Sequence, residues 1–412
     1  MVSTAPLVRR TDLAYADRMI VLALLACSGN SAILVTLQGQ VVDFPSSTGV
    51  EGATLSFENA NGMPLVSTTT SDLGDWSATF VLPYDTDDGA QVFGYVEHDG
   101  HVSTSVHHQL RFRDVKDAEA TIHPGRMQSA RILEVEPYQL APASEFDGTV
   151  SGRVFDAVVA NQAAGIGGLT LTVREGIDAT ETSPVVATSV TDGFPAPGDY
   201  RIDGLPAGTY TVEIAGGGIW ADARFTAVSI GDEDTPDQNG ATSVALAEDQ
   251  FRVVLSWGAI PPDIDTHLSG PGQLELDPSL VEDRFHVFFG NKEYPAGSGP
   301  ANAVVFLDVD DTSSFGPETV TVRRADPGYY KYVLHDYTNG TAAASGDTSQ
   351  LSASKCKVQL FAGAAQVETY YVPTGRVGTA WTVFEIDGDS LRPYMISRFS
   401  ETSDVTDPLF FY

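Results

Sequence analysis

Short runs in which apolar or β-branched residues alternate with polar ones recur along most of the chain, for example at residues 54–57, 170–173 and 210–214. Gly, Pro, Asn and Asp separate these runs, and helical periodicity is nearly absent after residue 30. A period of two is typical of strands that bury one face. Because 412 residues exceed the usual size of one domain, the sequence predicts an all-β protein built of tandem antiparallel β-sandwiches.

The charge balance excludes several classes of partner. The chain has 55 Asp and Glu against 23 Lys and Arg, which gives a formal net charge of -32. A protein that binds nucleic acid needs a basic surface to displace counterions from the phosphate backbone. We therefore expect no nucleic-acid partner, and no docking on anionic lipid through side chains.

An apolar run at residues 19–26 ends at Cys27 and is preceded by three arginines. Its length suits the ~7–15 residues of a signal-peptide core and is far below the ~20 residues that span a bilayer. Its end, Leu-Leu-Ala-Cys at residues 24–27, resembles a bacterial lipobox. The resemblance implies a signal peptide at 1–27, acylation of Cys27 and a tether at 28–36. The alternatives are an ordinary signal peptide, or a buried apolar strand that happens to contain Cys27.

An internal repeat is present in the first 250 residues. Segments of the first copy and their counterparts in the second are 38–43, 50–55 and 70–76, then 151–156, 165–171 and 189–193. Asp-Gly or Asp-x-Gly steps follow in both copies, and such steps close hairpins. Each copy is therefore expected to be a small sandwich of about seven strands.

These segments, with the Leu-Pro-Ala-Gly-Thr-Tyr step at residues 205–210, resemble the carboxypeptidase regulatory-like domain, which has a transthyretin-like (prealbumin-like) fold. The resemblance implies two such sandwiches, at 37–114 and 148–247, with a connection at 115–147. In that family the modules are mostly stalks or binding accessories and not catalysts. The fold alone does not settle the function.

The C-terminal region, residues 249–412, follows a different pattern. Its markers are the segments 251–258, 262–271, 307–312 and 329–339. This pattern resembles the YfaP-like family, a bacterial domain of unknown function. The resemblance implies a third, larger β-sandwich, secretion, and a surface or periplasmic location, but no established chemistry.

Two acidic segments of the C-terminal region are candidates for a metal site. Residues 263, 265 and 267 alternate, so their side chains share one face if the segment is extended. Residues 308 and 310 share a face in the same way, with residue 311 opposite at the turn. The candidate metal ligands are Asp263, Asp265, His267, Asp308, Asp310 and Asp311.

Oxygen ligands from two such turns suit Ca²⁺, which takes ~6–8 oxygens, so Ca²⁺ is the candidate cofactor. Adding His267, His286 or His335 to the ligands would favour a transition metal instead. The alternative is that the aspartates cap a turn, while His267 packs beneath a sheet and hydrogen-bonds to one of them.

Tyrosines are the candidate ligand-binding residues. Tyr330 and Tyr332 share one face of an expected strand, and Tyr337 follows shortly after. Exposed tyrosines would suit sugars or peptides. The alternative is that this face belongs to the core, as in most sandwiches.

Motifs of catalysis are missing from the sequence. It has no Gly-x-Ser-x-Gly, no His-Glu-x-x-His and no phosphate-binding glycine loop with lysine. Cys356 alternates with Val358 and Leu360, which predicts a buried structural thiol. We therefore expect that the protein is not an enzyme.

Together these features predict a non-catalytic lipoprotein in the cell envelope of a Gram-negative bacterium, held at the outer membrane only by its lipid anchor. It would act as a spacer with a binding or adhesion head, whose partner is a carbohydrate or an envelope protein. One alternative is a carbohydrate-binding accessory protein. Another is a metal-dependent hydrolase that uses Asp263, Asp265 and His267.

Overall fold

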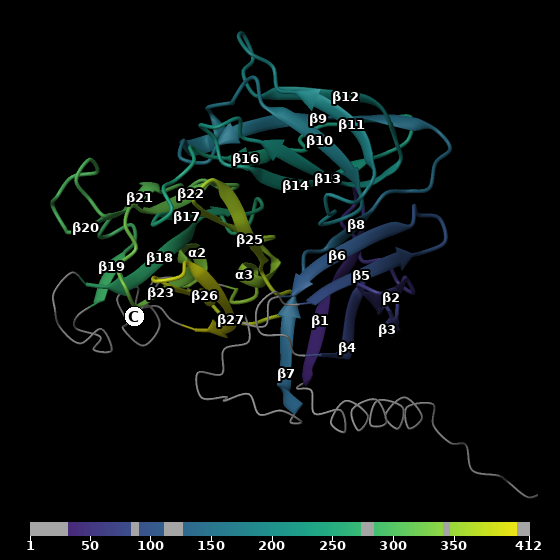
Figure 1. The fold of residues 1–412 in the computed structure, drawn as a ribbon, viewed down its shortest axis with the longest axis horizontal. Coiled ribbons are helices and arrows are strands. Elements are labelled where there is room, and N and C mark those ends of the chain that lie inside the picture. The colour runs from purple at the N-terminus through teal and green to yellow at the C-terminus, as the bar shows by residue number, and fades with distance from the viewer. Residues whose placement is uncertain (1–31, 84–89, 111–126, 273–283, 341–346, 402–412) are drawn as a thin grey trace, which may run out of the picture.

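The computed structural model describes residues 32–83, 90–110, 127–272, 284–340 and 347–401. These residues form three β-sandwiches, coloured purple to blue, teal, and green to yellow in Figure 1. The all-β class expected from the sequence is confirmed. No helix in these ranges is long and apolar enough to cross a membrane. Cys27 and the expected signal peptide lie outside the described residues.

The first sandwich contains two four-stranded sheets. Its strands are β1 (Ala32–Asp43), β2 (Thr54–Asn59), β3 (Pro64–Thr69), β4 (Asp75–Pro83), β5 (Ala90–Glu97), β6 (Thr104–Leu110), β7 (Met127–Glu134) and β8 (Tyr138–Leu140). One sheet has the order β4-β1-β7, with β8 also paired to β1, and the other has the order β3-β2-β5-β6. Strands β7 and β8 run parallel to β1, and the remaining pairs are antiparallel.

The second sandwich repeats this arrangement strand for strand. Its strands are β9 (Asp147–Asp156), β10 (Thr170–Glu175), β11 (Val185–Val190), β12 (Asp199–Pro206), β13 (Gly208–Ala215), β14 (Ala223–Ser229), β15 (Asp234–Thr235) and β16 (Gly240–Thr242). The orders are β12-β9-β15, with β16 also paired to β9, and β11-β10-β13-β14. Strands β15 and β16 run parallel to β9, as β7 and β8 do to β1. The repeat detected in the sequence is therefore a repeat of topology.

The connection expected between the first two sandwiches, at 115–147, is in part strands. Within 115–147, strands β7 and β8 pair with β1 and complete the first sandwich. Within 230–249, strands β15 and β16 do the same for the second. These strands are short or carry little alternation, so the sequence pattern did not reveal them.

The third sandwich is larger. Its strands are β17 (Phe251–Ser256), β18 (Ile264–Pro271), β19 (Arg284–Val287), β20 (Glu293–Tyr294), β21 (Val305–Val309), β22 (Glu318–Val322), β23 (Tyr329–Asp336), β24 (Lys357–Ala362), β25 (Ala365–Tyr371), β26 (Ala380–Asp387) and β27 (Arg392–Ser400). One sheet has the order β20-β21-β22-β17-β24-β25, and the other has the order β19-β18-β23-β26-β27. The short helices α2 (Tyr337–Gly340) and α3 (Gln350–Ala353) connect β23 to β24.

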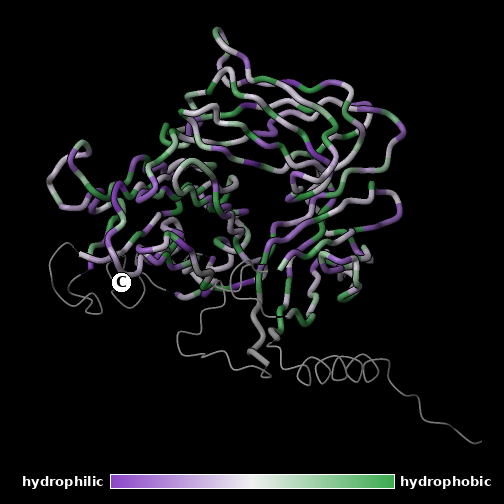
Figure 2. Tube along the Cα trace, viewed as in Figure 1, coloured by the Kyte–Doolittle hydropathy of each residue, from purple (hydrophilic) through white to green (hydrophobic). Residues whose placement is uncertain are grey.

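Alternation along the strands builds each core, and Figure 2 shows hydrophobic and hydrophilic residues alternating along the chain. On β17, for example, Phe251, Val253 and Leu255 face the core of the third sandwich. Strands β18 and β22 differ, because all of their residues are buried, including the polar ones. A strand covered on both faces holds polar side chains away from water, and this places acidic groups and histidines inside the third sandwich.

The three sandwiches meet around a common junction and do not form a straight row (Figure 1). Ile177 of the second sandwich belongs to the core of the first and pairs with Val106. Val254 and Phe361, on the outer face of β17 and β24, belong to the core of the second. A cavity of about 860 Å³ lies at this junction and is lined by residues of all three sandwiches, such as Gln40, Thr226 and Trp257.

Candidate metal centre

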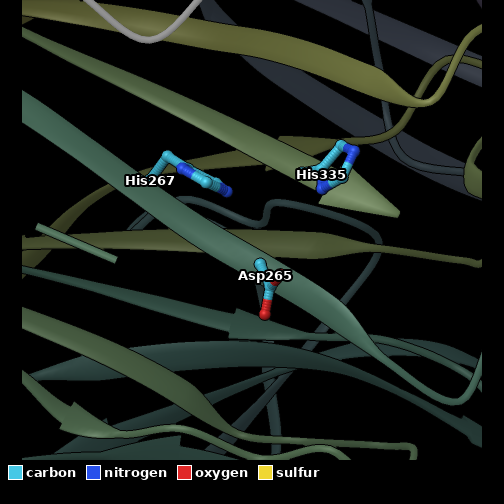
Figure 3. A group of neighbouring side chains, drawn as sticks. All are labelled: Asp265, His267 and His335. Carbon is cyan, nitrogen blue, oxygen red and sulfur yellow. The ribbon is translucent and has the colours of Figure 1, made fainter. Parts of the chain in front are cut away.

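Asp265, His267 and His335 are neighbours on one sheet of the third sandwich (Figure 3). Asp265 and His267 are two residues apart on β18 and therefore point to the same face. His335, on β23, is the cross-strand partner of Asp265, and directly opposite residues of an antiparallel pair share a face. One potential ligand atom from each residue lies within 4.8 Å of the other two.

On this face, His267 and His286 form a buried, stacked pair. His267 Nδ1 and His286 Nε2 share a hydrogen bond of 2.9 Å. The His267 ring is stacked on Phe288, with ring centroids 5.4 Å apart. Burial lowers the pKa of His286 to about 4, and burial, together with the neighbouring histidines, lowers the pKa of His267 well below its usual value. Both rings are therefore neutral near pH 7, which is the form of imidazole that binds metals.

A second group joins Asp265 to Asp310 and Glu318, again with potential ligand atoms within 4.8 Å of one another. Asp310 directly follows β21, and Glu318 is the first residue of β22. Both strands belong to the sheet opposite β18. Glu318 Oε1 accepts a hydrogen bond of 2.6 Å from the backbone N–H of Thr266 on β18. This group therefore joins the two sheets of the sandwich.

Burial, and then mutual repulsion, raise the pKa values of these carboxylates. Burial raises the pKa of Asp265 to about 8, and the charges of Asp263 and Asp310 add to the shift. Burial also raises the pKa of Asp263 to about 6, with contributions from Asp310 and Asp311. Glu318 has a pKa raised well above its usual value, by burial and then by Asp265. Either protons or a cation must relieve this concentration of negative charge.

Asp308 does not join the other candidate ligands, contrary to the expectation that it shares a face with Asp310. The pairing of β21 with β22 shifts its register between Leu307 and Val309, and such a bulge re-aims side chains. Asp308 Oδ2 instead accepts a hydrogen bond of 2.6 Å from Thr321 Oγ1. The remaining candidates from the sequence, at positions 263, 265, 267, 310 and 311, lie in or beside the two groups.

The tyrosine platform expected from the sequence is not exposed. Tyr330 and Tyr332 are 1% and 0% exposed and belong to the core of the third sandwich. The Tyr332 hydroxyl shares a hydrogen bond of 3.0 Å with Thr266 Oγ1. Tyr337 does reach the surface, with 37% exposure, and its ring meets Phe289 edge-on. The face that carries the first two tyrosines therefore serves packing, as the alternative from the sequence had it.

Sequence reasoning missed Glu318 and did not commit to His335. Glu318 stands at the start of a strand that otherwise alternates Thr and Val, so its pattern is that of an ordinary strand end. The only hint is its position shortly after the acidic turn at residues 308–311. His335 was considered only as an addition to the aspartates, although the register with Asp265 makes it a direct neighbour.

Comparisons with known proteins add little. No family model and no curated protein matches the chain. Among solved structures, the Bacillus anthracis TIE protein is 13% identical over 73% of this chain and 44% of that chain, with a TM-score of 0.20. GBS52, the minor pilin of Streptococcus agalactiae, is 12% identical over 51% of this chain and 95% of the pilin, with a TM-score of 0.19. SAV2460, of unknown function, is 17% identical over 38% of this chain and 90% of that chain, with a TM-score of 0.24. At such TM-scores these similarities carry no argument about function.

Proposed function

We propose that this chain is a non-catalytic protein of the bacterial cell envelope, anchored through Cys27, in which two sandwiches form a spacer and the third is a binding or adhesion head. The observation that supports a spacer is the packing between sandwiches. Phe361 and Val254 of the third sandwich are 0% and 1% exposed because they pack into the core of the second. A head that is held through a shared core keeps a fixed position relative to the second sandwich.

Hydrogen bonds reinforce both junctions. Between the second and third sandwiches, Asp222 N donates to Ala364 O at 2.8 Å and Thr319 Oγ1 donates to Ala157 O at 2.6 Å. Between the first and second, Ile177 N donates to Ser105 O at 2.9 Å. Buried backbone groups that depend on a neighbouring sandwich for their partners resist separation, because parting would leave them to be rehydrated.

The side chains that could carry catalysis are poorly placed for it. Cys356 is 0% exposed, and burial raises the pKa of its thiol to about 12, so the reactive thiolate does not form near neutral pH. Asp265 and His267, the residues of the hydrolase alternative, are 2% and 0% exposed. A catalytic group must reach its substrate, and these groups are closed off in the packed sandwich.

Exposed apolar and aromatic side chains of the third sandwich support a head that binds a partner. Ile260 and Phe315 are 60% and 55% exposed on neighbouring loops, which are joined by a hydrogen bond of 2.7 Å from Ser314 N to Pro262 O. Tyr337 offers a partly exposed ring on the same sandwich. Such residues suit the apolar centre of a protein interface or the face of a sugar, which are the two partner classes that we propose.

Membrane fractionation of a Gram-negative host tests the anchor. Cys27→Ser should move the protein from the membrane fraction to the soluble fraction and abolish labelling with palmitate, because each buried CH₂ of an acyl chain contributes ~0.8 kcal/mol. Cys356→Ser is the matched control, since it removes the other cysteine of the chain but leaves position 27 intact. A wild-type protein that takes up no palmitate, with a Cys27→Ser variant that still sediments with membranes, would refute the anchor.

A further inference from the structure

Among the residues that the structure describes, five carboxylates of the third sandwich each keep one buried oxygen without a hydrogen-bond partner. These oxygens are Asp263 Oδ1, Asp265 Oδ2, Asp310 Oδ1, Asp311 Oδ2 and Glu318 Oε2. Buried polar atoms in folded proteins almost always have a partner, because an unsatisfied one destabilises the folded state, and more strongly so when it is charged. Five at one place indicate that a positively charged ligand belongs among them.

Three of these carboxylates are held in place by their other oxygen. Glu318 Oε1 accepts the N–H of Thr266 at 2.6 Å. Asp311 Oδ1 accepts the N–H of Ser313 at 2.9 Å and its hydroxyl at 2.7 Å. Asp310 Oδ2 accepts Lys292 Nζ at 2.5 Å. Each side chain thus has one oxygen that fixes its position and a second oxygen that is left over, which is the arrangement of a preformed ligand set.

Turn chemistry alone does not account for this arrangement. Glu318 is 0% exposed and lies at a strand start, so its free oxygen caps no turn and meets no solvent. Asp336 is also buried, and it has the hydrogen bonds that a buried carboxylate normally has, because both of its oxygens accept hydrogen bonds from Asn339. Lys292 is bonded to Asp310 alone among these carboxylates, and its side chain is 54% exposed. One exposed ammonium cannot neutralise five carboxylates.

We propose that Asp265, Asp310 and Glu318 bind one divalent cation of the Ca²⁺ type, and that Asp263 and Asp311 complete its oxygen shell. Potential ligand atoms of the first three lie within 4.8 Å of one another. Ca²⁺ holds its oxygens at ~2.3–2.6 Å, so two oxygens on opposite sides of the ion are ~4.6–5.2 Å apart. Five carboxylate oxygens with one or more waters give the ~6–8 ligands that Ca²⁺ takes, whereas a tetrahedral Zn²⁺ site would leave several unused.

The bound cation would join three segments of the third sandwich. Asp263 and Asp265 flank the start of β18, Asp310 and Asp311 follow β21, and Glu318 begins β22. The first two of these segments adjoin the loops that present Ile260 and Phe315. The cation therefore links the two sheets of the sandwich and fixes the loops that carry the exposed apolar side chains. This inference does not depend on the proposed anchor or on the identity of the partner.

Thermal melting of the full chain tests the site. In chelator, the melting temperature of the third sandwich should be lower than in Ca²⁺ by about 5–10 °C at a hundred-fold excess of Ca²⁺ over its Kd, with NaCl at equal ionic strength as reference. Calorimetric titration should give one bound Ca²⁺ per chain. Hydrogen exchange of residues 259–263 and 311–316 should slow when Ca²⁺ is added.

Two isosteric variants test whether the Ca²⁺ response comes from the proposed ligands or from another carboxylate close by. Glu318→Gln keeps the carbonyl that accepts the Thr266 N–H but removes the charge, so it should abolish the Ca²⁺ response while melting in chelator at or above the wild-type temperature. Asp308→Asn is the matched control, because Asp308 is two residues from Asp310 but bonds to Thr321. It should keep the full Ca²⁺ response.

Two results would overturn the proposal. Equal melting temperatures in chelator, Ca²⁺ and NaCl would mean that protons alone relieve the buried carboxylates. A response to Zn²⁺ but not to Ca²⁺, lost in His267→Gln and kept in Glu318→Gln, would assign the ion to the other group, Asp265 with His267 and His335.

Discussion

At the scale of single residues, burial decides how the acidic groups of this chain behave. Glu136 lies between β7 and β8 and is 6% exposed where the three sandwiches meet. Its Oε2 accepts a hydrogen bond of 3.0 Å from Thr226 Oγ1 of the second sandwich. Burial raises the pKa of Glu136 to about 8, and the Asp178 carboxylate adds to the shift, while Lys357 opposes it. The group therefore joins the sandwiches in its protonated form.

This raised pKa predicts a pH dependence of stability. The pKa of Glu136 is higher in the folded state than in the unfolded state. Its contribution to the free energy of unfolding is therefore fully present below about pH 4.5 and is lost as the pH rises through about 8. We expect the melting temperature of the wild type to fall more steeply between about pH 5 and 8 than that of Glu136→Gln, which is neutral throughout. Glu145→Gln, at an exposed position, should follow the wild type. Parallel profiles for the wild type and Glu136→Gln would contradict this assignment.

Some of the buried acidic residues could be predicted from the sequence and others could not, for physical reasons. Asp265 and Asp310 stand in acidic, alternating segments, so their residue types and spacing suggested oxygen ligands. Asp308 looked equivalent, but a bulge in β21 turned it away, and bulges have no clear signature in one sequence. Glu136 was not predicted because its burial arises only when three separate sandwiches come together.

At the scale of elements, the two repeats share an interlocked turn before their second strand. In the second sandwich, Thr191 Oγ1 donates to Ile166 O at 2.7 Å and accepts Leu169 N at 2.9 Å. In the first, Thr70 Oγ1 donates to Val50 O at 2.6 Å and accepts Ala53 N at 2.8 Å. Each buried threonine thus replaces backbone partners that the chain lacks as it enters the strand.

A glycine beside this turn is required by its close neighbour. A Cβ on Gly165 would lie 1.7 Å from Pro197 O, whereas a Cβ on Gly193 would meet nothing within 4 Å. Gly165→Ala should therefore force the backbone apart and destabilise the second sandwich by about 3 kcal/mol or more, which lowers its melting temperature by at least ~12 °C. Gly193→Ala should change it little. Scanning calorimetry would report both melts, and similar melting temperatures for the two variants would show that the turn relaxes freely.

Strand topology was predictable to the extent that each strand carries its own pattern. The alternating strands and the repeat were found because local residues specify them, and the same glycine and threonine positions recur in both copies. The short parallel strands were not predicted from the sequence, since a strand of two or three residues, such as Asp234–Thr235, is too short to show an alternation of apolar and polar residues. Those strands exist because a neighbouring strand offers them backbone partners, which is information from the fold and not from the segment.

At the scale of the whole molecule, the question is whether three sandwiches behave as one body. Apolar side chains cross both junctions, with Ile177 in the core of the first sandwich and Phe361 in the core of the second. Lys355 Nζ also reaches Ser47 Oγ at 3.1 Å, which closes the ring between the third sandwich and the first. Domains joined by small polar contacts move relative to one another, whereas domains that share a core do not.

Distances between spin labels test this rigidity. In a Cys27→Ser background, where Cys356 is buried and unreactive, one label pair at Glu97→Cys and Asp389→Cys spans the first and third sandwiches. A second label pair, at Glu97→Cys and Gln91→Cys, lies along the single strand β5, with the two positions about 20 Å apart by the rise per residue. The width of its distance distribution is the width expected when both labels sit on one rigid element. We expect equally narrow distributions for both pairs. Phe361→Ser should broaden only the first, because it removes the side chain that packs the third sandwich into the second. A broad distribution for the first pair in the parent protein would mean that the head moves freely and that the first two sandwiches are no rigid spacer.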